Sequence, residues 1–160
     1  MKNRPIGIFD SGVGGLTVAH AVKQMLPGES IIYFGDTAHL PYGDKSAEAI
    51  QFYSAKITEF LLTFDAKVVL VACNSASASA FSTLRKEFSE KTILIDVIDP
   101  VVEYIGTRNF SRVGVIGTKR TISSGTYEQK LTGKNPATTV VSMATPLLVP
   151  MIEEGFIFDD

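Results

Sequence analysis

The chain alternates short apolar runs with longer amphipathic stretches, and this alternation limits the folds that it can adopt. The short runs predict strands at residues 6–9, 31–34, 68–72, 93–97, 113–116 and 138–141. The amphipathic stretches predict helices at residues 16–26, 47–62, 77–88 and 127–131. Strands that alternate with helices are typical of a doubly wound α/β fold. We therefore predict a mostly parallel sheet with helices on both faces.

The size and composition of the chain exclude several classes of protein. With 160 residues and 45% hydrophobic content, the chain is large enough to bury a core. Its net charge of -2 and its lack of a basic run argue against binding to nucleic acid or to a membrane surface. No apolar stretch reaches the ~18 residues of a membrane span, and the N-terminus lacks the apolar core of a signal peptide. We expect a soluble, cytoplasmic protein.

A single cysteine, Cys73, follows the third predicted strand and precedes a helical stretch. One cysteine excludes a disulfide framework and the paired spacings of zinc sites, and we expect no metal site. The N-terminus of a helix carries partial positive charge and free N–H groups, which favour a thiolate over a thiol. Free cysteines are also among the most buried residues, so the alternative is an inert core residue.

Polar side chains follow five successive predicted strands, at the point where each strand ends. They are Asp10 and Ser11, then Asp36 and Thr37, then Cys73, Asn74 and Ser75, then Asp96 and Asp99, then Thr118 and Thr121. In an open α/β sheet, ligands bind outside the carboxyl ends of the strands, so we expect these residues to share one rim. The local alternatives are Asp10 and Asp36 as strand-end caps, Asp99 as the N-cap ahead of Pro100, and Ser75 and Thr118 as caps of the helices that follow.

The glycine-rich loop at residues 12–15 indicates a small ligand rather than a nucleotide. Its Gly-x-Gly-Gly spacing matches neither the dinucleotide fingerprint nor a Walker A loop, and it contains no lysine. The neighbouring Asp10 would repel a phosphate and attract an ammonium group. Backbone N–H groups of Gly43, Asn74 and Ser75, with the nearby hydroxyls, are suited to hold carboxylates. This combination favours an amino acid as the ligand.

A cysteine beside the Cα atom of an amino acid suits two reactions, attack on a carbonyl or abstraction of the Cα proton. Nucleophilic cysteine hydrolases pair the cysteine with a histidine, and we expect both His20 and His39 to be structural or exposed. Proton abstraction needs a desolvated thiol with a carboxylate neighbour, for which Asp10 and Asp36 are the candidates. Because the Cα proton is weakly acidic, the site must also stabilise the developing carbanion with fixed donors and exclude water.

Several segments match one known family in order along nearly the whole chain. They are residues 8–18, 33–38, 41–43, 72–78, 114–118 with Thr121, and 146–155. In these segments the chain resembles the glutamate racemases of the cofactor-independent aspartate/glutamate racemase superfamily. The resemblance implies two α/β lobes with the site between them, here residues 1–97 as the first lobe and residues 98–160 as the start of a second.

The resemblance also implies an activity. Members of the family interconvert L- and D-glutamate by abstracting the Cα proton with a cysteine thiolate, need no cofactor, and supply D-glutamate for peptidoglycan. Glutamate is then the small-molecule partner, and we expect a homodimer. Related members of the superfamily offer alternatives, namely an aspartate racemase or a decarboxylase of a small diacid. A glutamate-binding module without catalytic activity is a further alternative.

The family's functional residues have counterparts here. Cys73 matches the first of two catalytic cysteines, and Asp10 matches an acidic helper. The matched substrate contacts are Asp10, Ser11, Pro41, Tyr42, Gly43, Asn74, Ser75, Thr118 and Thr121, and the matched accessory acids are Asp36 and Glu153. Ser75 stands where the family usually has threonine, which keeps the hydroxyl.

The main departure concerns the second catalytic cysteine. Family members are longer and carry it in a Cys-Thr-His motif, which these 160 residues do not contain. We therefore expect half a site, with weak activity or none in this chain alone. Residues 147–155 predict the beginning of a further helical unit, and the apolar side chains of Leu147, Leu148, Phe156 and Phe158 predict self-association.

Overall fold

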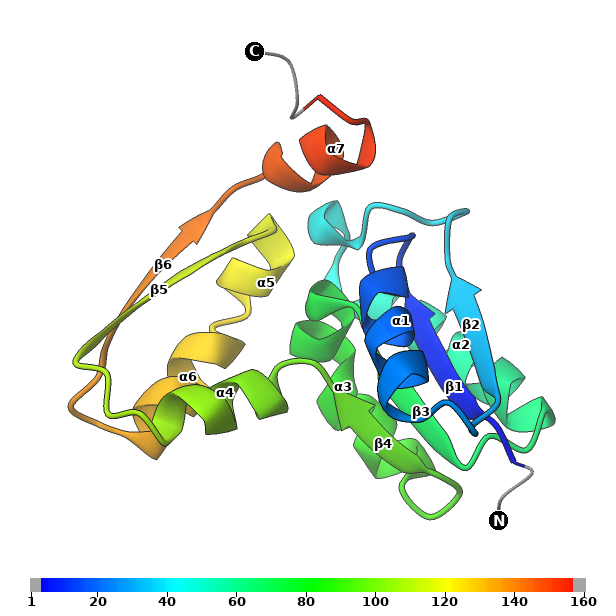
Figure 1. Cartoon of the computed structure of the whole chain (residues 1–160). Helices are drawn as coiled ribbons and strands as arrows, with labels where there is room; N and C mark the ends of the chain where they lie inside the picture. Colours follow the sequence, from blue (N-terminus) through cyan, green and yellow to red (C-terminus); the bar gives the residue numbers. More distant parts are fainter. Residues whose placement is uncertain (1–3, 157–160) are drawn as a thin grey trace.

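The computed structural model describes residues 4–156 and contains two parallel sheets (Figure 1). The first sheet has the order β2-β1-β3-β4 and consists of β1 (Ile6–Asp10), β2 (Ile31–Gly35), β3 (Val68–Val71) and β4 (Ile93–Asp96). All of its neighbouring strands run parallel. The predicted α/β fold with a parallel sheet is confirmed, and the first four predicted strands end within one residue of the observed ones.

Helices cover both faces of the first sheet. They are α1 (Leu16–Met25) on one face, and α2 (Ala47–Thr63) and α3 (Asn74–Phe88) on the other (Figure 1). Successive side chains of a strand point to opposite faces, so Ile8 packs with the side chains of α1, whereas its neighbour Phe9 packs with those of α2 and α3. Both side chains are fully buried, which makes this sheet the centre of the core.

The second sheet is smaller and has one covered face. It pairs β5 (Arg112–Gly117) with β6 (Thr139–Ala144), and α4 (Asp99–Gly106) and α6 (Thr126–Lys134) pack against it. Val113, Val115 and Val140 face these helices, where Val102 and Leu131 are buried. The sequence correctly places both strands, but hydrophobic periodicity does not show which strands pair. The structure shows that these two form a sheet of their own.

Short elements complete the chain. They are η1 (Tyr42–Asp44), a 3-10 turn, α5 (Lys119–Ser123) and α7 (Leu148–Glu153). The helix α7 agrees with the helical unit predicted at residues 147–155. Leu147 and Phe156 are exposed and Leu148 is at the edge of exposure, as expected, while Phe158 lies outside the described residues.

Two predicted helix starts are wrong, for different reasons. Helix α3 begins at Asn74 instead of residue 77, because Cys73 itself is the N-cap residue and the helix follows the strand directly. Helix α4 begins at Asp99, so Asp99 is not the N-cap. The Asp96 carboxylate accepts a hydrogen bond from the Asp99 N–H at 2.9 Å, which satisfies that helix end, and the Asp99 side chain instead pairs with Lys130.

The two sheets are joined by hydrogen bonds between their helices. Thr126 Oγ1 donates to the Ala78 carbonyl at 3.1 Å, and Arg120 Nε donates to the Lys45 carbonyl at 3.1 Å. Residues that follow β1, β3 and β5 line a common pocket. Among residues 4–156, none of the helices combines the length and the apolar character that crossing a membrane requires.

Candidate active site

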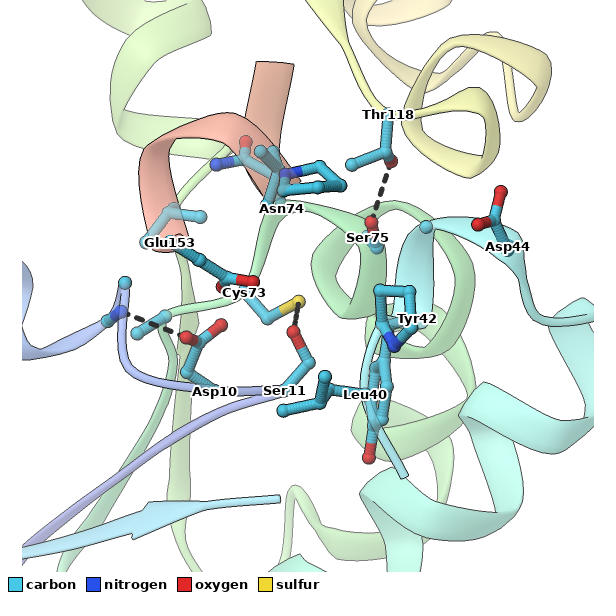
Figure 2. Close-up of a pocket in the computed structure, with 18 of the residues that line it drawn as sticks. Asp10, Ser11, Leu40, Tyr42, Asp44, Cys73, Asn74, Ser75, Thr118 and Glu153 are labelled. Atoms are coloured by element: carbon cyan, nitrogen blue, oxygen red, sulfur yellow. Dashed lines mark hydrogen bonds between the residues drawn. The ribbon is translucent and has the colours of Figure 1, made fainter. Parts of the chain in front are cut away.

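A pocket of about 340 Å³ lies where the carboxyl ends of the two sheets meet (Figure 2). Most of the residues predicted to form a site line it: Asp10, Ser11, Pro41, Tyr42, Gly43, Cys73, Asn74, Ser75, Thr118 and Glu153. The two others, Asp36 and Thr121, are buried immediately behind the wall. Val97, which follows β4, lines the pocket. Asp96 and Asp99 do not line it, contrary to the prediction.

Cys73 lies at the junction between β3 and α3, buried against the loop that follows β1. Its Sγ atom is 3.5 Å from Ser11 Oγ (Figure 2). Burial, and then the negative charge of Asp10, raise the pKa of the Cys73 thiol to about 11, against smaller opposing effects of Ser11 and the Ala76 N–H. The helix amides thus act in the predicted direction but are outweighed. Cys73 is therefore a neutral thiol at pH 7.

Asp10 is fixed by the glycine-rich loop. Its Oδ2 atom accepts hydrogen bonds from the N–H groups of Gly15 at 2.9 Å and Gly12 at 3.3 Å. A side chain at position 15 would place its Cβ 2.7 Å from Asp10 Cβ, so only glycine fits there. The loop's glycines therefore serve to wrap the backbone around a carboxylate, which agrees with the argument against a phosphate loop.

Tyr33 is a residue near the site that the sequence did not single out. It projects from β2 and donates a hydrogen bond from Oη to the Gly12 carbonyl at 3.0 Å. Burial and the charge of Asp10 raise its pKa to about 12, so it remains a donor at neutral pH. Tyr33 lies in the segment 33–38 that matches the racemases, and this was the only signal that could have found it.

Asp36 supports the pocket wall without entering the pocket. It accepts a hydrogen bond from Tyr42 Oη at 2.6 Å and contacts His39 Nδ1 at 2.7 Å. Burial and the bond to Asp36 hold the pKa of Tyr42 far above its ordinary range. Of the two carboxylates considered as partners of Cys73, Asp10 is therefore the one beside the thiol. As expected for structural or exposed histidines, His39 contacts Asp36 and His20 is exposed on α1.

A cluster of hydroxyl groups joins the two sheets at the pocket. Ser75 Oγ lies 2.8 Å from Thr118 Oγ1 (Figure 2). It also lies 3.4 Å from Thr121 Oγ1. Thr118 caps α5 by accepting a hydrogen bond from the Thr121 N–H, whereas Ser75 lies inside α3 and is not its cap. A Cβ at Gly43 would lie 2.7 Å from Thr118 Cβ, so the backbone of residues 42–44 touches the second sheet's loop directly.

Glu153 brings a second carboxylate to the pocket from α7. Its Oε1 atom lies 3.3 Å from the position of a Cβ built on Gly12, which places it over the loop that holds Asp10. Residues 4–156 contain no group of three or more histidine, cysteine, aspartate or glutamate side chains that is arranged to hold a metal ion. The reactive groups of the pocket are a buried thiol, two carboxylates and a rim of hydroxyl and amide donors.

The chain belongs to the Asp/Glu/hydantoin racemase family, whose model matches residues 15–146. The resemblance to glutamate racemases is confirmed by individual relatives. The chain is 47% identical to the glutamate racemase of Geobacter metallireducens over 157 residues, which are 98% of this chain and 57% of that protein. It spans 58% of the length of the Neisseria meningitidis glutamate racemases, to which it is 41% identical.

Solved structures agree with the fold. The glutamate racemase of Francisella tularensis, crystallised with D-glutamate, superposes with a TM-score of 0.94 at 43% identity, covering 100% of this chain and 60% of that one. The glutamate racemase of Aquifex pyrophilus gives a TM-score of 0.85 at 40% identity, covering 98% of this chain and 61% of that one. The arrangement of both sheets is therefore that of part of a glutamate racemase.

Proposed function

We propose that the pocket binds glutamate and that Cys73 exchanges the Cα proton on one face of it, one half of a glutamate racemisation. The observation that carries the proposal is the position of Cys73, at the end of β3 beside Asp10 and Ser11, in a pocket rimmed by donors. Support also comes from the family and from relatives that are named glutamate racemases.

The pocket offers complementary partners for each charged group of glutamate. The Asp10 carboxylate, whose Oδ2 atom is already bound by the loop, pairs with the ammonium group. Asn74, Ser75 and Thr118 present amide and hydroxyl donors that receive a carboxylate. Tyr42 and Gly43 close the wall on the side of η1. The substrate is thereby held with its Cα atom toward the thiol.

Binding of the ammonium group also prepares the thiol for catalysis. The charge of Asp10 is one of the two causes that raise the pKa of Cys73, so a cation placed on Asp10 lowers that pKa. The thiol releases its proton to solvent, and the resulting thiolate takes the Cα proton, forming an S–H bond while the Cα–H electron pair becomes the carbanion. Return of a proton from Cys73 regenerates the same enantiomer. Inversion requires a donor on the opposite face, which the resemblance assigns to a second cysteine.

The resemblance to glutamate racemases suggests a wider role, which we include in the proposal. The proposal includes the supply of D-glutamate for peptidoglycan, in the cytoplasm, by a homodimer, with residues 1–97 and 98–160 belonging to two lobes. No metal or organic cofactor takes part in the proposed step, because the thiol and the donors of the pocket supply its proton transfer and its charge stabilisation.

Exchange of hydrogen at Cα tests the proposal. The chain is incubated with DL-glutamate in D2O, and loss of the Cα proton signal is followed by NMR. The wild type should exchange, and Cys73→Ala should reduce exchange to the rate without protein. Exchange that survives in Cys73→Ala contradicts the role of the thiol, and absence of exchange in the wild type contradicts the proposed function.

The neutral state of Cys73 favours a second candidate, decarboxylation of a small diacid. That reaction breaks a C–CO2 bond, and the carbanion then takes one proton from one side, for which a single neutral thiol is sufficient. Release of CO2 from methylmalonate, with no exchange on glutamate, would favour this candidate. Exchange on aspartate faster than on glutamate would favour an aspartate racemase. Tight binding of glutamate without exchange would favour a binding module.

A further inference from the structure

Tyr127, on the second sheet's side of the molecule, contacts Asn74, a residue that lines the pocket. It lies in the first turn of α6, and its Oη atom donates a hydrogen bond to Asn74 Oδ1 at 2.7 Å. Asn74 is the first residue of α3, follows Cys73 directly and lines the pocket (Figure 2). The sequence predicted a helical stretch from residue 127 but no role for its phenol.

The contact fixes the direction of the Asn74 amide. An asparagine amide has an accepting oxygen and a donating nitrogen, and the two ends exchange places when the group flips. In the structure the Tyr127 hydroxyl donates to Asn74 Oδ1. Burial, and then the charge of Asp96, raise the pKa of Tyr127, so the hydroxyl retains the proton that it donates. With Oδ1 engaged in this way, Nδ2 is the end left for a ligand, and it has no hydrogen-bond partner within the part of the chain that the structure describes.

The support for Tyr127 is itself rigid. The preceding residue, Thr126, donates from Oγ1 to the Ala78 carbonyl at 3.1 Å, which ties the start of α6 to the helix that carries Asn74. Its N–H donates to Ser124 Oγ at 3.2 Å. Phenol and amide are thus held on elements bound to each other, and little conformational entropy remains to be lost when the pair orients a ligand.

We propose that Tyr127 is a positioning residue that orients Asn74 so that its Nδ2 amine faces the ligand and selects a carboxylate group. The inference rests on the proposed function, since glutamate supplies that carboxylate. An amide flipped the other way would present Oδ1 to the carboxylate, and the two oxygens would repel. Tyr127 thereby lets α6, which is remote from the reacting atoms, determine how tightly the substrate is held.

A double-mutant cycle tests whether Tyr127 acts through Asn74. The dissociation constants of D- and L-glutamate are measured by calorimetry for the wild type, Tyr127→Phe, Asn74→Ala and the double variant. We expect Tyr127→Phe to raise Kd by roughly three- to tenfold, the usual net value of one hydrogen bond. In the Asn74→Ala background the same change should have no effect. The matched control is Tyr104→Phe, since Tyr104 is exposed on α4 and distant from the pocket contacts.

The pattern of the cycle separates positioning from a general structural role. A Tyr127→Phe effect of equal size in both backgrounds overturns the inference, as does an unchanged Kd. The exchange rate at saturating glutamate should stay at the wild-type value in Tyr127→Phe, because the phenol touches neither Cys73 nor Asp10.

A measurement without ligand distinguishes failure of this inference from failure of the proposed function. The side-chain NH2 signals of Asn74 are assigned by NMR from their disappearance in Asn74→Ala. Tyr127→Phe should shift these signals, and Tyr104→Phe should leave them in place. A wild type that binds no glutamate contradicts the proposed function, and the shift then still decides whether Tyr127 orients Asn74. Signals that Tyr127→Phe does not move overturn the inference.

Discussion

The two sheets differ in how completely their apolar faces are covered. In the first sheet, helices lie on both faces, and Ile8 and Phe9 are fully buried on opposite sides of one strand. In the second sheet, α4 and α6 cover one face only. On the other face Ile116, Val141 and Met143 are 61%, 46% and 59% exposed, and the pairing of Ile116 with Met143 places them side by side. Parallel strands are ordinarily covered on both faces.

The two sheets also supply different residues to the pocket. Cys73, Asp10 and Ser11, which the proposed function places around the reacting atoms, lie at strand ends of the first sheet, which has helices on both faces. Thr118 and Glu153, from the less covered part, line the rim. Proton transfer depends on sub-ångström placement, which a close-packed core provides, whereas a rim tolerates adjustment as the ligand enters. Substitutions in the two parts should therefore affect the reaction differently.

The largest effect on Cα exchange is expected from Asp10→Asn, at the end of β1 in the first sheet. Loss of the carboxylate removes the partner of the substrate ammonium, and Cα exchange on glutamate should fall by roughly 100-fold or more. The same change removes a negative charge that raises the pKa of Cys73, so that pKa should drop below about 11. Alkylation by iodoacetamide across a pH series measures the second effect, and thiol reactivity should begin at a lower pH.

Asp65→Asn is the matched control for Asp10→Asn. Asp65 is exposed, lies beyond the end of α2, and has a positive φ of 58° that asparagine also tolerates. The Asp65→Asn protein should exchange the Cα proton of glutamate at the wild-type rate, and its thiol should be alkylated with the wild-type pH profile. Faster or unchanged exchange in Asp10→Asn would remove Asp10 from the mechanism.

A smaller effect is expected from Gly43→Ala, at the contact between the two parts. The new Cβ would lie 2.7 Å from Thr118 Cβ and 2.9 Å from Thr118 Cγ2, so Thr118 must move away from Ser75. Overpacking of this kind costs about 1–3 kcal/mol, and we expect the Kd for glutamate to rise roughly tenfold. Calorimetry measures it. Gly28→Ala is the control, because its new Cβ meets no atom within 4 Å, and it should bind glutamate like the wild type. Equal affinities of the wild type, Gly43→Ala and Gly28→Ala would show that the contact between Gly43 and Thr118 is unimportant for binding.

The open face of the second sheet predicts self-association, as do the exposed Leu147 and Phe156. Light scattering should show the wild type as a dimer or larger species, and the double change Ile116→Lys and Met143→Lys should shift it toward the monomer. Met25→Lys is the control, because Met25 is 81% exposed on α1, away from this face. A wild type that is monomeric at high concentration would refute the expected association.

The smallest effect concerns stability at high pH. The folded pKa of Cys73 is raised from 9.0 to about 11, so the folded state favours the neutral thiol. The buried thiol therefore contributes fully to the free energy of unfolding below pH 9, and this contribution is lost as the pH rises toward 11. At pH 10 the loss is about 1 kcal/mol. Urea unfolding of the wild type and of Cys73→Ser at pH 8 and pH 10 measures the difference. An identical pH dependence in both proteins would show that burial does not perturb the thiol.

The sequence predicted the strands well, and it predicted which polar residues gather at one pocket, because both depend on local patterns. Apolar runs locate β1 to β6, and polar residues at their ends identify Asp10, Cys73 and Thr118. The protonation state of Cys73 was not predictable, since the helix end is local but the burial and the charge of Asp10 come from packing. The position of Asp36 was not predictable for the same reason, because it depends on packing. Its hydrogen bond with Tyr42 holds Asp36 behind the wall of the pocket.

The enantiomers of glutamate, exchanged separately, give the most direct test that this chain carries the base for one face of Cα. L-glutamate and D-glutamate are incubated with the chain in separate tubes of D2O, and the Cα proton is followed by NMR together with the optical purity. We predict that one enantiomer exchanges its Cα proton with retention of configuration and that the other does not. Exchange with conversion of both, which needs a second base within the 160 residues, or exchange of neither, would contradict the account.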